Sequence, residues 1–188
     1  MKKIKTSILG IDPSYHSSGY CLIDFHSGKI IEYGVILHVK DVGLCKSLYD
    51  ISEKIKSLII DYNVISVAIE QLNFSSNFRT SQALLRVQGA LMRVVYEIKQ
   101  QEIVQFHNIS WRSKLGIKRP KKEINTKNGK KEYPTIKVDN KKVKKDIKYI
   151  TVVKINEMYG LNLSYSENDI ADAIGICTCL YQDIKALK

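Results

Sequence analysis

Two short apolar segments of this chain each run directly into an acidic residue. Ile4 to Ile11 is strand-like and ends at Asp12, and the β-branched run Val64 to Ile69 ends at Glu70. The second run is too continuously apolar for a half-exposed strand, which predicts a central position in a sheet covered on both faces. If the two strands are parallel neighbours, both acids lie at the carboxyl edge, where open α/β sheets bind their ligands.

The order of the remaining patterns predicts an α/β fold. Period-two and β-branched runs predict three further strands, at Tyr20 to Phe25, Lys29 to Leu37 and Glu102 to Phe106. Helical spacing predicts four main helices, at Val42 to Tyr62, Ser81 to Gln100, Asp146 to Tyr159 and Asp169 to Ala186, with a short turn or helix at Ser110 to Leu115. Thr80 or Ser81 and Ser166 are expected to cap helix starts, and Gly160 to end a helix.

These elements favour a mixed five-stranded sheet that is flanked by helices and opens with an antiparallel meander. We expect one domain over residues 1–188, because this length and a hydrophobic content of 44% are ordinary for a single globular domain. Residues 118–148 are then an insertion into that domain.

Most of the net positive charge lies in that insertion. Residues 118–148 contain 13 Lys or Arg and 4 Asp or Glu, which supplies +9 of the chain's net +11. Few apolar residues and the Asn128-Gly129 turn signal predict an exposed arm or hairpin, with a solvated loop as the plainer alternative. Clustered lysines favour nucleic acid, because they release its condensed counterions. The residues expected to contact phosphates there are Lys141, Lys142, Lys144 and Lys145.

Two further acids, Asp169 and Asp172, lie three residues apart at the start of the last helix, and therefore on one face of it. If they meet Asp12 and Glu70, four carboxylates converge without a basic partner, and divalent metal is needed to hold them. Each acid also has a structural explanation. Asp12-Pro13 is a common turn opening, Ser166 and Asp169 fit a capping box, and paired aspartates are frequent on helices.

Several classes of protein are disfavoured. The apolar stretches are far shorter than the roughly 20 residues that cross a bilayer, and the Lys-rich opening contains no long apolar core. The four cysteines form no C-x-x-C pair, and the four histidines lack zinc-ligand spacing. We therefore expect a cytoplasmic protein with no membrane segment and no structural zinc.

Three motifs carry a family resemblance. GIDPSYHSSGY at residues 10–20, AIEQ at 68–71 and NDIADAIGI at 168–176 resemble the acidic motifs of the RuvC-type Holliday junction resolvases, within the ribonuclease H-like superfamily. Each motif is weak alone, but their order and spacing match over most of the chain. The resemblance implies a homodimeric, metal-dependent endonuclease that resolves four-way DNA junctions by paired symmetric nicks. The products expected from it are a 5′-phosphate and a 3′-hydroxyl.

The resemblance also implies residue roles. Asp12, Glu70, Asp169 and Asp172 match the catalytic tetrad, which would hold two Mg²⁺ ions, with Mn²⁺ as a substitute. Asp12 would bridge the ions, Glu70 and Asp172 would complete their shells, and Asp169 would bind one ion or assist the water. The residues expected to contact DNA by resemblance are Phe74, Phe78, Arg112, Lys114, Lys145 and Lys148. The two phenylalanines would stack on junction bases, and a packing role is their alternative.

The helix from Ser81 to Gln100 resembles the dimer-forming helix of the family, with Gly89 allowing close approach. The alternative is that its broad apolar stripe is core. The basic arm is longer than the bacterial pattern, which favours a phage-encoded branch of the family.

Competing functions remain at this stage. A nuclease of the same fold could act on other branched DNA or on RNA/DNA hybrids, and the motifs do not separate these substrates. In a non-catalytic binder of structured DNA, the acids would only be caps. An ATP-binding protein of the actin and sugar-kinase type is disfavoured, because the chain is short and lacks glycine-rich phosphate loops.

Overall fold

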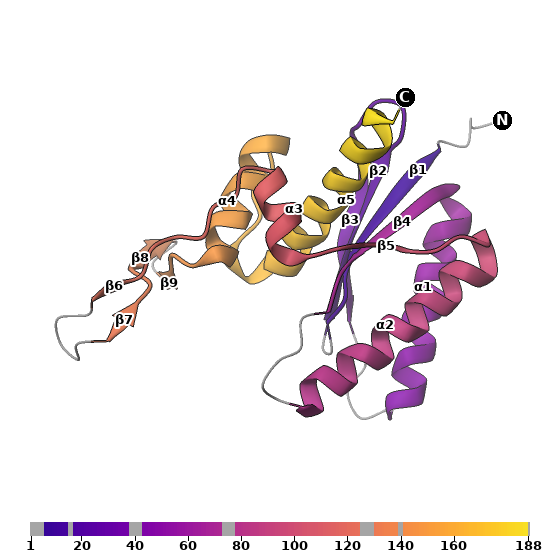
Figure 1. Cartoon of the computed structure of the whole chain (residues 1–188), viewed down its shortest axis with the longest axis horizontal. Helices are drawn as coiled ribbons and strands as arrows, with labels where there is room; N and C mark the ends of the chain where they lie inside the picture. Colours follow the sequence, from indigo (N-terminus) through magenta and orange to yellow (C-terminus); the bar gives the residue numbers. More distant parts are fainter. Residues whose placement is uncertain are drawn as a thin grey trace.

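The computed structural model describes residues 6–14, 17–37, 43–72, 78–124, 130–138 and 141–187. Its centre is a five-stranded sheet in the order β3-β2-β1-β4-β5 (Figure 1). The strands are β1 (Ser7–Asp12), β2 (Ser17–Asp24), β3 (Ile30–Leu37), β4 (Val64–Glu70) and β5 (Val104–Phe106). The first three are antiparallel, whereas β1, β4 and β5 run parallel. The predicted mixed sheet, with the first and fourth strands as parallel neighbours, is confirmed.

Helices cover both faces of the sheet (Figure 1). One face carries α1 (Leu44–Asp61) and α2 (Phe78–Lys99). The other carries α5 (Asn168–Ala186), against which α3 (Asn108–Lys114) and α4 (Ile147–Tyr159) pack. A short 3₁₀ turn, η1 (Tyr165–Glu167), precedes α5. Within the described ranges, we find no helix with the length and apolar character needed to span a membrane.

The alternation of side chains along a strand decides which face each acid occupies. On β1, Leu9 belongs to the core under α1 and α2, whereas Ile8 belongs to the core under α5. Asp12 is four residues after Ile8, so its side chain lies on the same face of the sheet, the face that α5 covers. On β4, Ala68 also belongs to the core under α5, so Glu70 continues that side. Both acids thus face the helix that carries Asp169 and Asp172.

Two glycines let α5 lie directly on the sheet. A Cβ atom on Gly10 would lie 2.6 Å from the backbone oxygen of Ala173, and one on Gly19 would lie 2.0 Å from that of Asp169. Because the obstructing atoms belong to the helix backbone, no change of side-chain rotamer could relieve either contact. The absence of side chains at these positions therefore sets how close the N-terminal half of α5 comes to β1 and β2.

The basic arm folds as two short antiparallel ladders that project from the body of the molecule (Figure 1). β6 (Glu123–Ile124) pairs with β7 (Lys131–Glu132), and β8 (Thr135–Val138) pairs with β9 (Lys141–Lys144). The segment thus contains two short ladders, where the sequence predicted an exposed arm or a hairpin. The Asn128-Gly129 turn lies outside the described residues.

Two predicted helix caps are wrong. α2 begins at Phe78, one turn before the expected start, and Ser81 is buried within the helix and does not cap it. The capping box before α5 is formed by Ser164 and Glu167, and not by Ser166 and Asp169, because η1 adds a turn upstream. The end of α4 at Gly160, which adopts a left-handed conformation, is as predicted.

Candidate active site

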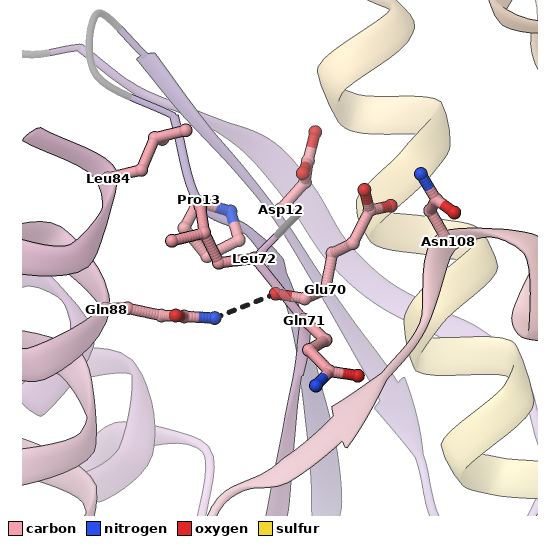
Figure 2. Close-up of a pocket in the computed structure, with 8 residues that line it drawn as sticks. All are labelled: Asp12, Pro13, Glu70, Gln71, Leu72, Leu84, Gln88 and Asn108. Carbon is pink, nitrogen blue, oxygen red and sulfur yellow. Dashed lines mark hydrogen bonds between the residues drawn. The ribbon is translucent and has the colours of Figure 1, made fainter. Parts of the chain in front are cut away.

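Asp12 and Glu70 lie next to each other at the carboxyl edge of the sheet. β1 and β4 are in register through Ile11 and Ile69, so the next position on each strand carries an acid. Both carboxylates border a pocket of about 220 Å³, and Figure 2 shows them on neighbouring strands beside Asn108 of α3. The structure therefore brings together the first two predicted site residues.

α5 adds the other two acids. Asp172 is buried, at 5% exposure, and Asp169 is half-buried, with its Oδ2 accepting a hydrogen bond of 2.9 Å from the Ser17 hydroxyl. Since Ser164 and Glu167 form the capping box, the capping-box explanation for Asp169 is wrong. Asp169, Asp172 and Glu70 all lie near enough to Asp12 to act on its ionisation. All four predicted carboxylates thus belong to one electrostatic cluster.

The cluster carries excess negative charge. Burial raises the pKa of Asp12 well above its usual value, and the charges of Asp172, Glu70 and Asp169 raise it further. Burial also raises the pKa of Asp172 to about 6, and Arg112 opposes this rise while Glu70 adds to it. Perturbed carboxyl groups gathered in a pocket are typical of functional sites.

A basic partner lies inside the cluster. It was not predicted from the sequence. The Arg112 guanidinium donates to Asp172 Oδ2 at 2.7 Å and to Glu70 Oε2 at 3.5 Å. It is 11% exposed and stacks 4.2 Å above the ring of Trp111. The expectation that the acids converge without a basic partner is therefore wrong. In this structure, α3 inserts a cation between β4 and α5.

Trp111 positions Glu70 and was not identified from the sequence. Its indole N–H donates a hydrogen bond of 2.9 Å to Glu70 Oε2, and its side chain is fully buried. The ring packs over Gly175 of α5, where a Cβ atom would lie 2.4 Å from it. Trp111 is the only tryptophan in the chain, and it lies next to a predicted DNA contact. Its being the only tryptophan was the sequence signal that could have identified it.

Gln88 supports the same strand end from the opposite face of the sheet. Its side-chain amide donates a 3.0 Å hydrogen bond to the backbone oxygen of Glu70, drawn as a dashed line in Figure 2. Gln88 is 8% exposed and lies among the apolar residues that α2 packs into the core. A polar side chain at a core position of the helix was the sequence signal for this contact.

The chemistry of the donor set suits a divalent metal. The cluster offers only carboxylate oxygens as ligands, and Asp172 Oδ1 is buried with no hydrogen-bond partner. However, no group of three or more His, Cys, Asp and Glu side chains among the described residues is arranged closely enough to hold an ion. One oxygen of Glu70 and one of Asp172 are instead paired with Arg112. The ligand types fit a metal, while the arrangement shown is that of an arginine-bridged cluster.

The other residues that were predicted to contact DNA differ in their position relative to the carboxylate cluster. Lys148 lies near the cluster, since it lowers the pKa of Asp172, and it donates to Asn168. Lys114 forms an ion pair with Asp183, eleven residues beyond Asp172 on α5 and so about 16 Å along the helix axis. Phe78 is 75% exposed at the start of α2, and Phe74 lies outside the described residues.

The arm lysines lie away from the carboxylates. Lys142 and Lys144 are exposed and project from one face of β9, since Val143 between them is buried. Lys145 is also exposed, and its backbone N–H donates to the oxygen of Pro134. The side chain of Lys141 is outside the described part of the structure.

The contact between Trp111 and Gly175 can be tested by a double-mutant cycle. Gly175→Ala should lower the free energy of unfolding by about 1–3 kcal/mol, because the new methyl group overlaps the outer atoms of the indole. Trp111→Phe removes those atoms and the N–H donor, and should cost a similar amount. In the double variant the two effects should fall short of additivity by at least about 0.5 kcal/mol, measured by urea unfolding. Strictly additive effects would contradict the packing described.

The ionisation of Asp172 predicts a pH dependence of stability in EDTA. Folding raises its pKa from 3.8 to about 6, so this group favours folding fully below about pH 4 and loses that contribution as the pH rises through 6. Asp172→Asn cannot titrate. Between about pH 4 and pH 7, wild type should therefore lose up to about 3 kcal/mol of unfolding free energy relative to the variant. Parallel stability curves would show that Asp172 is not perturbed.

Comparisons with known proteins bear on the identity of the chain. Residues 8–115 match the model of the family described as crossover junction endodeoxyribonuclease RuvC. The RuvC of Orientia tsutsugamushi (strain Ikeda) is 40% identical over 91 residues, which cover 47% of this chain and 57% of that protein. The RuvC of Fusobacterium nucleatum is 27% identical over 172 residues, covering 90% of this chain and 77% of that protein.

Solved structures support the fold. The Thermus thermophilus RuvC structure superposes with a TM-score of 0.68 at 13% identity, covering 96% of each chain. The yeast mitochondrial Holliday junction resolvase gives a TM-score of 0.58 at 15% identity, covering 95% of this chain and 78% of that one. The predicted ribonuclease H-like architecture is thereby confirmed. Since the family model covers more than half of the chain, including Asp12, Glu70 and the Trp111-Arg112 pair, this chain belongs to the RuvC family of crossover junction endodeoxyribonucleases.

Proposed function

We propose that this chain is a metal-dependent endonuclease that resolves four-way DNA junctions by paired symmetric nicks. The observation that carries the proposal is the convergence of Asp12, Glu70 and Asp172, with Asp169 beside them, at the carboxyl edge of the sheet. The alignment with the Orientia relative spans 57% of that protein's length, so activity and substrate are proposed and not transferred. The proposal treats residues 1–188 as one nuclease domain with the 118–148 arm inserted.

Each acid has a proposed role that its position supports. The charges of all three other acids act on Asp12, so Asp12 would be the carboxylate to hold both Mg²⁺ or Mn²⁺ ions. Glu70 and Asp172 lie on either side of Arg112 and complete the two shells. Asp169, held by the Ser17 hydroxyl, binds one ion or orients the attacking water.

In two-metal sites of this kind, the ions generate a nucleophile from water and stabilise the leaving oxygen of an in-line displacement. The protein's own residues then have three tasks. Trp111 and Gln88 fix Glu70 through its side chain and its backbone oxygen. The buried position of Asp172 limits access of water to its carboxylate. Lys148, which acts on Asp172 and donates to Asn168, is proposed to contact a DNA phosphate.

Paired nicks need two active sites, so the proposal includes a homodimer. α2 supports it: Val87, Leu91 and Val95 are buried against the sheet, while Leu85 and Tyr96 are exposed. Leu85 and Tyr96 are thus apolar residues of α2 that the core of this chain does not cover, and the proposal assigns them to the dimer contact. A cytoplasmic location and a phage origin stay predictions.

The decisive test is cleavage of synthetic four-way junctions, compared with three-way junctions, linear duplex and RNA/DNA hybrid, in Mg²⁺ or EDTA. Wild type should nick opposite strands of the four-way junction in pairs, and only with metal. Asp12→Asn and Glu70→Gln should lower the cleavage rate at least about 100-fold while junction binding persists, because they remove carboxylate charge from the site.

The matched controls are Asp50→Asn and Glu97→Gln, which make the same chemical changes in exposed ion pairs on α1 and α2. They should cleave as wild type does. Equal cleavage by Asp12→Asn and wild type would contradict a nuclease function of the cluster. Preferred cutting of three-way or hybrid substrates would favour the broader nuclease, and binding without cleavage would favour a structured-DNA binder.

The arm is proposed to hold DNA by charge. Lys137, Lys142 and Lys144 share one face of the β8–β9 ladder, opposite Ile136 and Val143. Replacing Lys142 and Lys144 with Ala should weaken junction binding and lower the slope of log K against log salt concentration by about 2, because each lysine is expected to neutralise one phosphate. Fluorescence anisotropy over a salt series measures both quantities.

The control for the arm is Lys54→Ala with Lys56→Ala, two exposed lysines of α1 on the opposite face of the sheet. This pair should leave both affinity and salt slope close to those of wild type. If the arm variant and the control have the same salt slope, the arm does not contact phosphates.

A further inference from the structure

The Arg112 side chain is built into the carboxylate cluster and does not lie at its surface. Its two terminal nitrogens contact Asp172 at 2.7 Å, Glu70 at 3.5 Å and the backbone oxygen of Asn108 at 3.3 Å. Only 11% of the side chain is exposed. A guanidinium held by two carboxylates, a carbonyl and an aromatic ring is in a site that stabilises its positive charge.

This contact uses oxygens that a divalent cation would need. Glu70 Oε2 accepts hydrogen bonds from both Trp111 and Arg112, and Asp172 Oδ2 accepts one from Arg112. Asp172 Oδ1 is buried and has no partner. In the part of the chain that the structure describes, no three acidic, histidine or cysteine side chains are arranged to hold an ion. The guanidinium and a divalent cation therefore compete for the same carboxylates.

We propose that Arg112 is an internal counter-cation, which pairs Glu70 with Asp172 in the metal-free protein and must leave this pairing when a divalent cation binds. The inference rests on the metal site of the proposed function and adds a regulator to it. Arg112 is then a positioning residue that keeps the acids together without metal and sets the metal concentration at which the site fills.

The Arg112 side chain borders a second cavity as well as the carboxylate cluster. Arg112 also lines a groove of about 310 Å³ between α3, the start of the arm and α4, whose walls include Ile117 and Ile147. The Nε atom of Arg112 is buried without a hydrogen-bond partner, so the present position does not satisfy the whole guanidinium. Lys118 and Arg119 line the same groove, which makes it a basic surface that suits a phosphate group.

Trp111 provides a direct readout. It is the only tryptophan of the chain, its ring lies 4.2 Å from the guanidinium carbon of Arg112, and its N–H contacts Glu70. Adding Mg²⁺ to the wild-type protein without DNA should change the tryptophan emission, because the Arg112 guanidinium then moves away from the Trp111 ring. The midpoint should coincide with that of Mg²⁺ binding measured by calorimetry. Unchanged emission at concentrations where calorimetry detects binding would overturn the proposal.

Variants separate the charge of Arg112 from its packing. Arg112→Gln removes the competing cation and should bind Mg²⁺ at least about tenfold more tightly than wild type, a difference of about 1.4 kcal/mol. Arg112→Lys keeps the charge but cannot reproduce the forked and stacked contacts, so its Mg²⁺ affinity should lie between those of wild type and Arg112→Gln. The matched control is Arg93→Gln, at an arginine that is 77% exposed and pairs with Glu97 on α2, and it should not change the affinity.

Removal of the Arg112 charge leaves buried carboxylates unpaired, so Arg112→Gln is expected to be less stable without metal. Thermal unfolding is therefore measured with and without Mg²⁺ for both proteins. Mg²⁺ should raise the Tm of Arg112→Gln by more than it raises the Tm of wild type. Equal or weaker Mg²⁺ binding by Arg112→Gln, or an equal or smaller rise in Tm, would overturn the counter-cation role alone. Absence of Mg²⁺ binding in both wild type and Arg112→Gln would overturn the metal site and the proposed function with it.

Discussion

Carboxylates from three separate elements share one partly buried edge of the sheet, and their negative charges repel one another there. Burial raises the pKa of Asp12 well above its usual value, and the charges of Asp172, Glu70 and Asp169 raise it further. Arg112 offsets part of this repulsion, since its charge opposes the rise in pKa of both Asp12 and Asp172. The cluster therefore needs a cation to offset its charge, and in this structure Arg112 is that cation.

The fold holds the acids against this repulsion by constraints that are distributed along the chain. The alternation of β1 and β4 turns Asp12 and Glu70 toward α5, and Gly10 and Gly19 admit the helix backbone at close range. On the other side of the cluster, Gly175 makes room for the Trp111 ring, which in turn fixes Glu70. Buried packing of α5 thus maintains a geometry that the charges alone would open.

The four acids could be predicted from the sequence because each follows a local pattern: an apolar strand that ends at Asp12 or Glu70, and a three-residue spacing on a helix for Asp169 and Asp172. The mixed sheet followed from the same periodicities. The bridge by Arg112 could not be predicted, because its partners lie 42 and 60 residues away and no local pattern joins them. The start of α2 was misplaced for a related reason, since Ser81 is buried by tertiary packing that overrides its preference for a cap.

The counter-cation role of Arg112 requires that the cluster exchange its arginine for divalent metal. Anomalous diffraction from crystals grown with Mn²⁺ can show this exchange. Manganese peaks are expected at about 2.1–2.2 Å from carboxylate oxygens of Asp12, Glu70 and Asp172, with the Arg112 guanidinium no longer bridging Glu70 and Asp172. A fully metal-loaded crystal in which Arg112 still joins these two acids and manganese lies elsewhere would contradict it.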